Sequence, residues 1–220
     1  MTDIDFQKLY QLQDAVLGLV FSEPSDLYLT GGTCLHRFIL EKRLSEDLDF
    51  FANDSSLFYQ QVRASLDRIS QKHELQLEVE HKDFFRARVD GRLQIDFVND
   101  HAAYLGSVEL RGALRCDNVL NILSNKLTAI MGRDDPKDVF DFYMICSFFS
   151  FSWDTIISSA LDKFHFSLDD LIVRLESFPE SLLKRLRILD ASFLDQALSS
   201  KGRLISEMLN GADHEAFLES

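Results

Sequence analysis

A stretch near the middle of the chain alternates apolar and polar side chains with the period of two that is typical of β-strands. Residues 75–99 contain three such runs, LQLEVE, FFRARVD and RLQIDFV. Asp90 and Gly91 stand between the last two runs, and this dipeptide is a strong signal for a two-residue hairpin turn. The chain therefore has to build a β-sheet that includes this hairpin.

Helical periodicity dominates most of the remaining sequence. Before the hairpin, we expect short strands at 27–29 and 47–51 and helices at 5–21, 33–42 and 55–72. After Asp117 the pattern is wholly helical, with helices expected at 118–131, 136–149, 153–164, 168–177, 181–189, 191–199 and 202–209. The sequence predicts an α+β fold, with a mixed sheet and helices over residues 1–117 and a C-terminal helical lobe over residues 118–220.

The composition limits the classes of protein to consider. The 220 residues include 36 acidic and 23 basic side chains, so the net charge is −13 with histidine neutral. A hydrophobic fraction of 46% argues against both intrinsic disorder and a membrane-spanning protein. The acidity argues against a surface that binds nucleic acid broadly. The charge is uneven, because residues 81–137 sum to +1 and the remainder to −14.

Targeting and disulfide patterns do not occur in this sequence. The start, MTDIDFQKLY, lacks the basic and apolar regions of a signal peptide. No apolar run approaches the roughly 18 residues that a membrane helix needs. Cys34, Cys116 and Cys146 are odd in number and far apart, so we expect neither a disulfide framework nor a zinc site. We therefore expect a cytoplasmic protein with no membrane partner.

Gly31, Gly32 and Thr33 stand where the expected strand 27–29 runs into the next helix. Glycines let the backbone approach a ligand closely, and the amides at a helix start attract phosphate. The alternative is a tight turn with a purely structural role, and the two glycines alone would favour that alternative.

Carboxylates occur on two of the expected strands. Asp47 and Asp49 are two residues apart, so both project from one face of their strand while Leu48 and Phe50 enter the core. Asp96 lies on the polar face of the run RLQIDFV. Each could be an ordinary exposed carboxylate. Together, beside a turn that suits phosphate, they indicate a two-metal site for phosphoryl transfer, because parallel carboxylates can share Mg²⁺.

The run LTGGTCLHRFILEKRLSEDLDFF resembles the signature of the DNA polymerase β-like nucleotidyltransferase superfamily, a GG or GS turn followed by Asp-x-Asp. More narrowly, residues 43–50 (RLSEDLDF) resemble the R-x-S-x-D-L-D-F segment of the AbiEii/AbiGii toxin family. Residues 126–142 are similar to that family's K-x-x-A…R…(R/K)-D-x-x-D segment. Cys34 replaces the commoner Ala, and Lys137 replaces Arg. No motif of the family matches the helices beyond about residue 145.

The resemblance implies a nucleotidyltransferase-type sheet and an activity. A nucleoside monophosphate would move from an NTP to an acceptor hydroxyl, with Mg²⁺ or Mn²⁺ as the cofactor. Family members are toxins of toxin–antitoxin or phage-abortive systems, and some add nucleotides to the tRNA 3′ end. The implied partners are therefore the NTP, tRNA or another RNA, and a cognate antitoxin protein. The helical lobe would close the active-site cleft.

The resemblance also implies roles for individual residues. Asp47 and Asp49 would hold the metal that carries the triphosphate. Asp96 would complete the second metal site and help to deprotonate the acceptor hydroxyl. Lys126 would neutralise phosphate charge, and Asp138 would position Lys126 or the nucleotide. The other nucleotide-binding residues would be Gly31, Gly32, Thr33, Arg43 and Ser45.

Alternatives remain for the second motif and for the function. The charged residues of this motif could simply be surface charges and helix caps, namely Lys126, Arg133, Lys137, Asp138 and Asp141. The acceptor could be a small molecule, which the negative charge favours over polyanionic tRNA. A non-catalytic nucleotide-binding protein is the third hypothesis, although the three carboxylates and the GG turn are all present. RNA binding would need a local basic patch, for which the candidates are Arg86, Arg88, Arg92, Arg111, Arg115, Lys126, Arg133 and Lys137.

Overall fold

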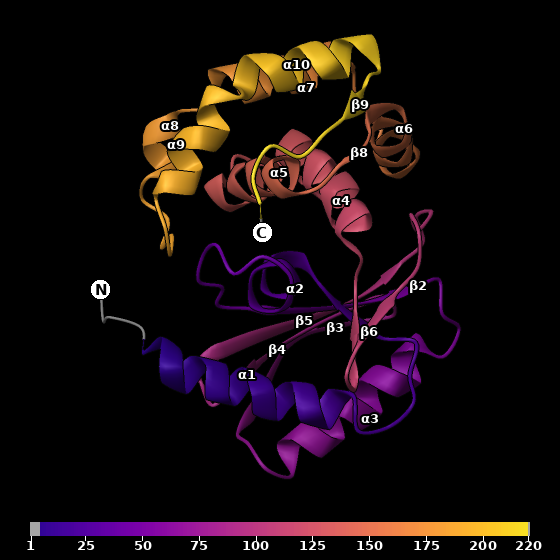
Figure 1. The fold of residues 1–220 in the computed structure, drawn as a ribbon. Helices are drawn as coiled ribbons and strands as arrows, with labels where there is room; N and C mark the ends of the chain where they lie inside the picture. Colours follow the sequence, from indigo (N-terminus) through magenta and orange to yellow (C-terminus); the bar gives the residue numbers. More distant parts are fainter. Residues whose placement is uncertain (1–4, 220) are drawn as a thin grey trace. The chain divides into compact units, whose positions relative to one another are not determined.

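The sheet predicted from the central hairpin has seven strands (Figure 1). The structure is a computed structural model, of which residues 5–219 are described. The strand order is β3-β4-β5-β2-β1-β7-β6, and β2 pairs in parallel with β5, as β1 does with β7. The other neighbours are antiparallel, so the sheet is mixed, as predicted. The strands are β1 (Tyr28–Thr30), β2 (Leu48–Asn53), β3 (Leu75–His81), β4 (Phe84–Val89), β5 (Leu93–Asp100), β6 (Glu109–Arg111) and β7 (Leu114–Cys116).

The hairpin between β4 and β5 confirms the turn signal in the sequence. Asp90 and Gly91 both adopt positive φ, +50° and +64°, as the central residues of a type I′ turn do. The first pair of the ladder is Val89 with Leu93, so three residues stand between the two strands and not the expected two. The turn therefore sets the register of β4 against β5, and this register decides which side chains meet further along the strands.

One face of the sheet is apolar and is covered by α1 (Phe6–Val20) and α3 (Phe58–Ser70) (Figure 1). Phe50 and Phe97 stack at 5.0 Å on this face, and both are fully buried. Phe21, just after α1, and Phe58, the first residue of α3, pack edge-on against Phe50 and Phe85 respectively. Because side chains alternate along a strand, the residues between these aromatic residues point to the opposite face.

The described chain divides into two compact units. Unit 1 holds the residues up to Cys34, Ser45–Ala102 and Val108–Asp117, and it contains the large sheet. Unit 2 holds Leu35–Leu44, Ala103–Ser107 and the chain from Asn118 onward. The boundary falls inside α2 (Gly31–Phe38), whose first turn belongs to unit 1 and whose later residues belong to unit 2.

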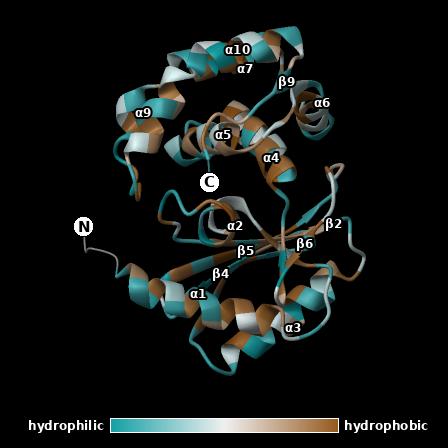
Figure 2. Ribbon diagram, in the orientation of Figure 1, coloured by the Kyte–Doolittle hydropathy of each residue, from teal (hydrophilic) through white to brown (hydrophobic). Residues whose placement is uncertain are grey.

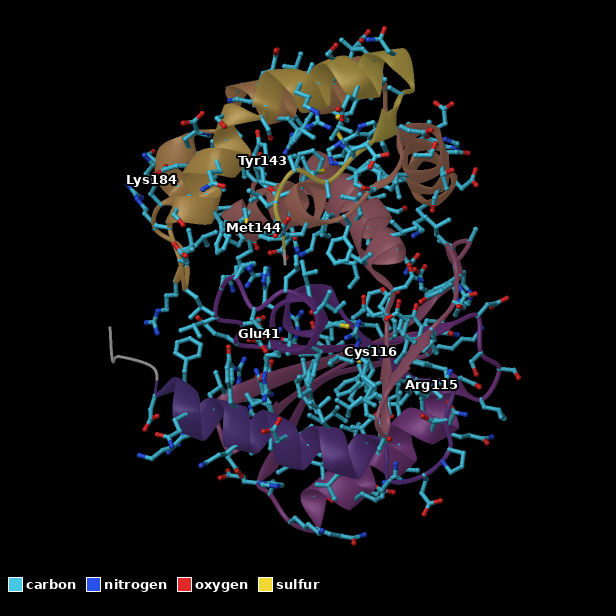
Figure 3. All side chains as sticks on the ribbon, in the orientation of Figure 1. Glu41, Arg115, Cys116, Tyr143, Met144 and Lys184 are labelled. Carbon is cyan, nitrogen blue, oxygen red and sulfur yellow. The ribbon has the colours of Figure 1, made fainter. Side chains whose placement is uncertain are left out.

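Unit 2 is mainly helical from Asn118 onward, and the expected division into domains at residue 117 stays a prediction. The hydropathy colouring shows mainly hydrophobic residues along its central helix α5 (Figure 2). Tyr143 and Met144, labelled in Figure 3, are among the buried residues of α5. Its elements from Asn118 onward are α4 (Val119–Gly132), α5 (Pro136–Phe148), β8 (Phe151–Ser152), α6 (Trp153–Lys163), α7 (Leu168–Ser177), α8 (Glu180–Leu183), α9 (Ser192–Ser199), α10 (Lys201–Asn210) and β9 (Asp213–His214).

Three further expectations about local structure were wrong. The helix expected at 33–42 begins at Gly31 and ends at Phe38. The helix expected at 181–189 ends at Leu183, because the following segment pairs its backbone with residues 42–44 instead. The strands β6 to β9 were not predicted, since two or three residues are too few to show an alternating pattern.

No helix among the described residues is long and apolar enough to cross a membrane. The expected cytoplasmic location stays a prediction. The three cysteines lie buried as free thiols.

Candidate active site

Four neighbouring strands of unit 1 place polar side chains in one row across the sheet. Asp49 on β2 lies directly beside Asp96 in the parallel register with β5. Arg86 on β4 opposes Asp96, and Thr30 on β1 opposes Asp49. Residues in register on neighbouring strands project to the same face. The row therefore lies on the face opposite Phe50, and the expectation that two strands bring carboxylates to one face matches this register.

Asp96 is held by Arg86 in a bidentate ion pair. Nε of Arg86 donates to Oδ1 at 2.9 Å, and Nη2 donates to Oδ2 at 2.6 Å. Gln94 adds a longer hydrogen bond to Oδ2 at 3.4 Å. Hydrogen bonding to Asp96 raises the pKa of Arg86, and the charges of Asp96, Glu78 and Asp47 act in the same direction. Asp47 is therefore near enough to this guanidinium to contribute to its electrostatic environment.

Gly31 lies against Asp49 and could not carry a larger side chain. Its φ of +70° is in the left-handed region, and a Cβ built on it would collide with Oδ2 of Asp49. The glycine thus lets the start of α2 approach the carboxylate closely. The amides of Gly32 and Thr33 lie in the first turn of α2, where N–H groups have no partner within the helix.

Thr33 and Ser45 tie the glycine turn to the segment that leads into β2. The Thr33 hydroxyl lies 2.8 Å from Oγ of Ser45 and also meets the backbone oxygen of Asp47. Both side chains are buried. The side chain of Gln13, on α1, donates to the backbone oxygens of Ser45 and Glu46. These contacts fix the position of Asp47 relative to the turn, and a direct contact of Ser45 with nucleotide stays a prediction.

Asp117 is a site neighbour that the sequence did not reveal. The Thr30 hydroxyl donates to Oδ2 of Asp117 at 2.6 Å, and the Asp117 amide donates to Leu29 at 2.8 Å. Asp117 is fully buried. Both Thr30 and Asp117 stand at strand ends without an unusual motif, so only the pairing of β1 with β7 brings them to the row.

The donor set at the row suits a hard cation. Neighbouring strands lie about 4.8 Å apart, so carboxylates in register can bind one small ion between them. Mg²⁺ commonly takes one or two carboxylates and completes its shell with phosphate oxygens and water. Within residues 5–219 no group of three or more His, Cys, Asp or Glu side chains is assembled that could hold a metal. Asp49 and Asp96 are the pair that fits, and Asp47 as a further ligand stays a prediction.

The second motif forms a buried ion cluster inside unit 2. Asp141, which has no side-chain exposure, accepts from Nε and Nη2 of Arg43 at 2.7 and 2.8 Å. It also lies 2.7 Å from Nζ of Lys126 and 2.8 Å from Nε2 of His36. Lys126 makes a second ion pair, at 2.9 Å, with Asp138. The interpretation of Lys126, Asp138 and Asp141 as surface charges is therefore wrong.

Burial and charge act against each other in this cluster. Burial alone would raise the pKa of Asp141, but the charges of Arg43 and Lys126, together with the hydrogen bond from His36, hold that pKa well below its usual value. Burial would lower the pKa of Lys126, but the charges of Asp141 and Asp138 raise it. Lys126 and Asp141 are therefore charged at neutral pH. The internal pairing of Arg43 leaves its expected contact with nucleotide as a prediction.

His36 differs from the rest of the cluster because the effect of burial on its pKa is larger than the effect of the neighbouring charge. Burial lowers the pKa of His36, although the Asp141 charge opposes the change. The backbone amide of Lys42 approaches Nδ1 at 3.4 Å, and Asp141 can only accept. The hydrogen-bond network thus assigns the neutral tautomer with the proton on Nε2.

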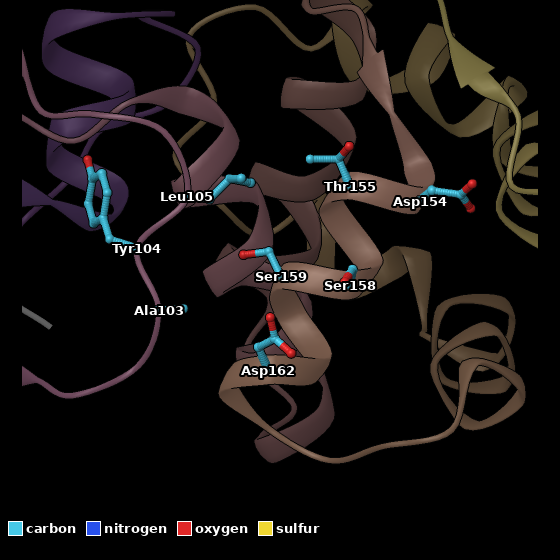
Figure 4. Close-up of a pocket in the computed structure, with 8 residues that line it drawn as sticks. All are labelled: Ala103, Tyr104, Leu105, Asp154, Thr155, Ser158, Ser159 and Asp162. Atoms are coloured by element: carbon cyan, nitrogen blue, oxygen red, sulfur yellow. The ribbon is translucent and has the colours of Figure 1, made fainter.

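A separate groove of about 580 Å³ lies within unit 2, between α6 and the segment 103–105 (Figure 4). Two acidic residues and three hydroxyl-bearing residues of α6 line it, together with the segment 103–105. The negative charge would repel a triphosphate, so the groove does not suit an NTP. The α6 residues that line it are Asp154, Thr155, Ser158, Ser159 and Asp162.

Comparison with known proteins identifies the family. Residues 19–219 match the family described as nucleotidyl transferase AbiEii toxin, type IV TA system. The chain belongs to this family, as the motifs around the glycine turn and Asp-x-Asp implied. No curated protein matches the sequence.

Solved structures confirm the fold. JHP933 from Helicobacter pylori superposes with a TM-score of 0.60 at 18% identity, covering 96% of both chains. The nucleotidyltransferase toxin MenT4 from Mycobacterium tuberculosis superposes with a TM-score of 0.54 at 14% identity, covering 93% of both chains. The α+β nucleotidyltransferase fold expected from the sequence is thus confirmed.

The lowered pKa of His36 predicts a pH dependence of stability. As the pH falls through about 6.5, unfolded His36 takes up a proton that the folded state refuses, so the free energy of unfolding decreases. His36→Gln cannot titrate and retains a donor for Asp141. Urea unfolding between about pH 7 and pH 5 should show wild type losing stability relative to this variant. In the control His101→Gln the difference should have the opposite sign, because hydrogen bonding to Asp54 raises the pKa of exposed His101. Parallel curves for wild type and His36→Gln would contradict the account.

The contact between Gly31 and Asp49 predicts a specific loss of function. Gly31→Ala adds a methyl group where Asp49 stands, and the carboxylate must move. Gly91→Ala is the matched control, because Gly91 has a similar φ of +64° but no atom lies within 4 Å of the position that a Cβ would take there. Both variants should lose about 1–2 kcal/mol of stability from backbone strain. Only Gly31→Ala should lower nucleotidyl transfer by about 10²-fold, as expected for misplacement by about 1 Å. Equal activity of the two variants would show that the close approach has no functional role.

Proposed function

We propose that this chain transfers a nucleoside monophosphate from an NTP to an acceptor hydroxyl, with Mg²⁺ or Mn²⁺ bound at Asp49 and Asp96. The observation that carries the proposal is the register of β2 with β5, which sets the two carboxylates side by side on the polar face of the sheet. Family membership over residues 19–219 supports the same activity.

The reaction assigns a different task to each carboxylate. The acceptor oxygen forms a bond to the α-phosphorus, the bond from that phosphorus to the α–β bridging oxygen breaks, and pyrophosphate leaves. A divalent ion, when bound, would offset the triphosphate charge and acidify the attacking hydroxyl. Asp49 stands against the glycine turn, so we assign it, together with Asp47, to the triphosphate side. Asp96 is one strand further from the turn, so we assign it to the acceptor hydroxyl and its proton.

The glycine turn is the proposed phosphate site. Amides in the first turn of a helix attract anions, and Gly31 brings this turn against Asp49. We assign the backbone amides of Gly32 and Thr33 to the β- and γ-phosphates. The Thr33 side chain has a different task, because its hydroxyl is used to hold the segment of Ser45 and Asp47.

Lys126 is proposed as the positive charge for the phosphates, with Asp138 as the residue that positions it. The 2.9 Å ion pair between the two side chains supports the second assignment. The raised pKa of Lys126 keeps it charged, as neutralisation of phosphate requires. The closing of the cleft by the helical lobe stays a prediction.

The acceptor we propose is an RNA end such as the tRNA 3′ end, and the toxin–antitoxin family implies a cognate antitoxin as a partner. A small-molecule acceptor is the second candidate, because several residues of the expected basic patch are neutralised within the protein. Acidic partners pair with Arg86, Arg88, Arg111, Lys126 and Arg133. Such pairing weakens the positive field that a polyanion would meet.

The activity is tested by incubating the protein with each α-³²P-labelled NTP, Mg²⁺ and total RNA. We expect labelled RNA with at least one NTP, and no label after chelation of the metal. Asp49→Asn should abolish labelling, because it removes a ligand on the triphosphate side. Asp96→Asn should lower kcat far more than it raises KM for the NTP, since its role lies with the acceptor. Asp67→Asn, at an exposed position on α3, is the control and should keep wild-type activity.

Each outcome of this assay discriminates between hypotheses. Full activity of Asp49→Asn, or labelling that resists chelation, would contradict the metal-dependent mechanism. Label that appears only with added small-molecule acceptors would select the second candidate. Inert wild type across all NTPs and acceptors would favour the non-catalytic hypothesis.

A further inference from the structure

The Asp96 carboxylate pairs with a cation that the protein itself supplies, the guanidinium of Arg86. Both of its oxygens accept from Arg86, at 2.9 and 2.6 Å. The two partners differ in exposure, because the Asp96 side chain is 12% exposed and that of Arg86 is 38% exposed. Asp96 is thus largely removed from water, whereas its partner reaches the surface.

This difference in exposure decides which partner can leave. A nearly buried carboxylate is costly to leave without a cation. A partly exposed guanidinium can turn outward and be hydrated at little cost. Asp96 therefore needs a positive charge at all times, but the geometry does not require that charge to come from Arg86.

A neighbouring ion pair on the same strands shows that Arg86 is placed differently from an ordinary cross-strand partner. Arg88, two residues along β4, pairs with Glu78 on β3 at 2.7 Å, away from Asp49 and Asp96. Arg86 instead pairs toward β5, and its partner lies in register with Asp49. Of these two arginines, Arg86 alone bonds to a carboxylate of the proposed metal site.

We propose that Arg86 is an internal counter-ion of the catalytic site, which occupies Asp96 in the resting protein and is displaced when the divalent metal binds. The inference rests on the proposed function, because it takes Asp49 and Asp96 as the metal pair. The metal and the guanidinium compete for the same oxygens and repel each other. Arg86 is thus a positioning residue that keeps Asp96 in place and sets the metal concentration at which the site fills.

Metal binding to the nucleotide-free protein tests this proposal without any activity. Mn²⁺ is titrated into the protein, and the free ion is followed by its electron paramagnetic resonance signal. Arg86→Met removes the charge but keeps an aliphatic stem. It should bind Mn²⁺ about tenfold more tightly than wild type, the size expected for losing one charged hydrogen-bonded competitor. Arg86→Lys, which cannot make the bidentate pair, should fall between the two. Arg88→Met is the matched control and should bind as wild type does.

Thermal unfolding supplies the second measurement. Without metal, Arg86→Met should unfold at a lower temperature than wild type, and Mn²⁺ should raise its Tm more than it raises that of wild type. If Arg86→Met does not fold without metal, the Mn²⁺ titration of Arg86→Lys decides. The proposal is overturned if Arg86→Met, or Arg86→Lys in that case, binds Mn²⁺ no more tightly than wild type does.

Asp49→Asn separates this inference from the proposed function. If wild type binds Mn²⁺, Asp49→Asn does not, and Arg86→Met is no tighter than wild type, the metal site stands and the counter-ion role falls. If no variant binds Mn²⁺, or if binding does not depend on Asp49, the metal site itself falls and takes the counter-ion role with it.

Discussion

The parallel pairing of β2 with β5 is the constraint on which the site in unit 1 depends. The stacking of Phe50 on Phe97 at 5.0 Å fixes that pairing from the apolar face. A slip by one residue would turn Asp49 or Asp96 into the core and bring a phenylalanine to the polar face, so the core itself enforces the register. The side-by-side carboxylates are the direct consequence of this aromatic pair. Arg86 and Thr30 extend the row because β4 and β1 are locked to the same two strands.

The two units neutralise the charge of their buried carboxylates in different ways. In unit 2, Asp141 is enclosed and is paired with Arg43, Lys126 and His36. Removing any one of these would leave charge or a polar group buried without its partner, so this cluster is suited to hold helices together. In unit 1, the corresponding cation, Arg86, is partly exposed and pairs with Asp96, which lies in register with Asp49. That arrangement is suited to exchange one cation for another.

Much of the fold and part of the candidate site could be predicted from the sequence. The alternation of apolar and polar residues is strong where one face of a strand is buried. Alternation in RLQIDFV placed Asp96 opposite the apolar residues, and Asp90-Gly91 set the hairpin that aligns Arg86 with it. Periodicity also gave the long helices to within a few residues, because their apolar faces are wide. Periodicity could not predict which residues pair across the sheet, since the register between β2 and β5 depends on tertiary packing. For the same reason, the sequence did not predict that Thr30 and Asp117 meet, because the strands that bring them together have only three residues each. It also did not predict that Lys126 and Asp141 are buried.

The central claim is that the Asp49–Asp96 pair, beside Gly31, is the place where metal and triphosphate meet. The most direct measurement is a crystal structure with Mn²⁺ and a non-hydrolysable NTP analogue, with the ion located by its anomalous scattering. We predict an anomalous peak between the carboxylates of Asp49 and Asp96, with the triphosphate against the amides of Gly32 and Thr33 and the Arg86 guanidinium turned away from Asp96. A peak elsewhere in the molecule, with Arg86 still bound to Asp96 and the triphosphate away from the glycine turn, would contradict the account.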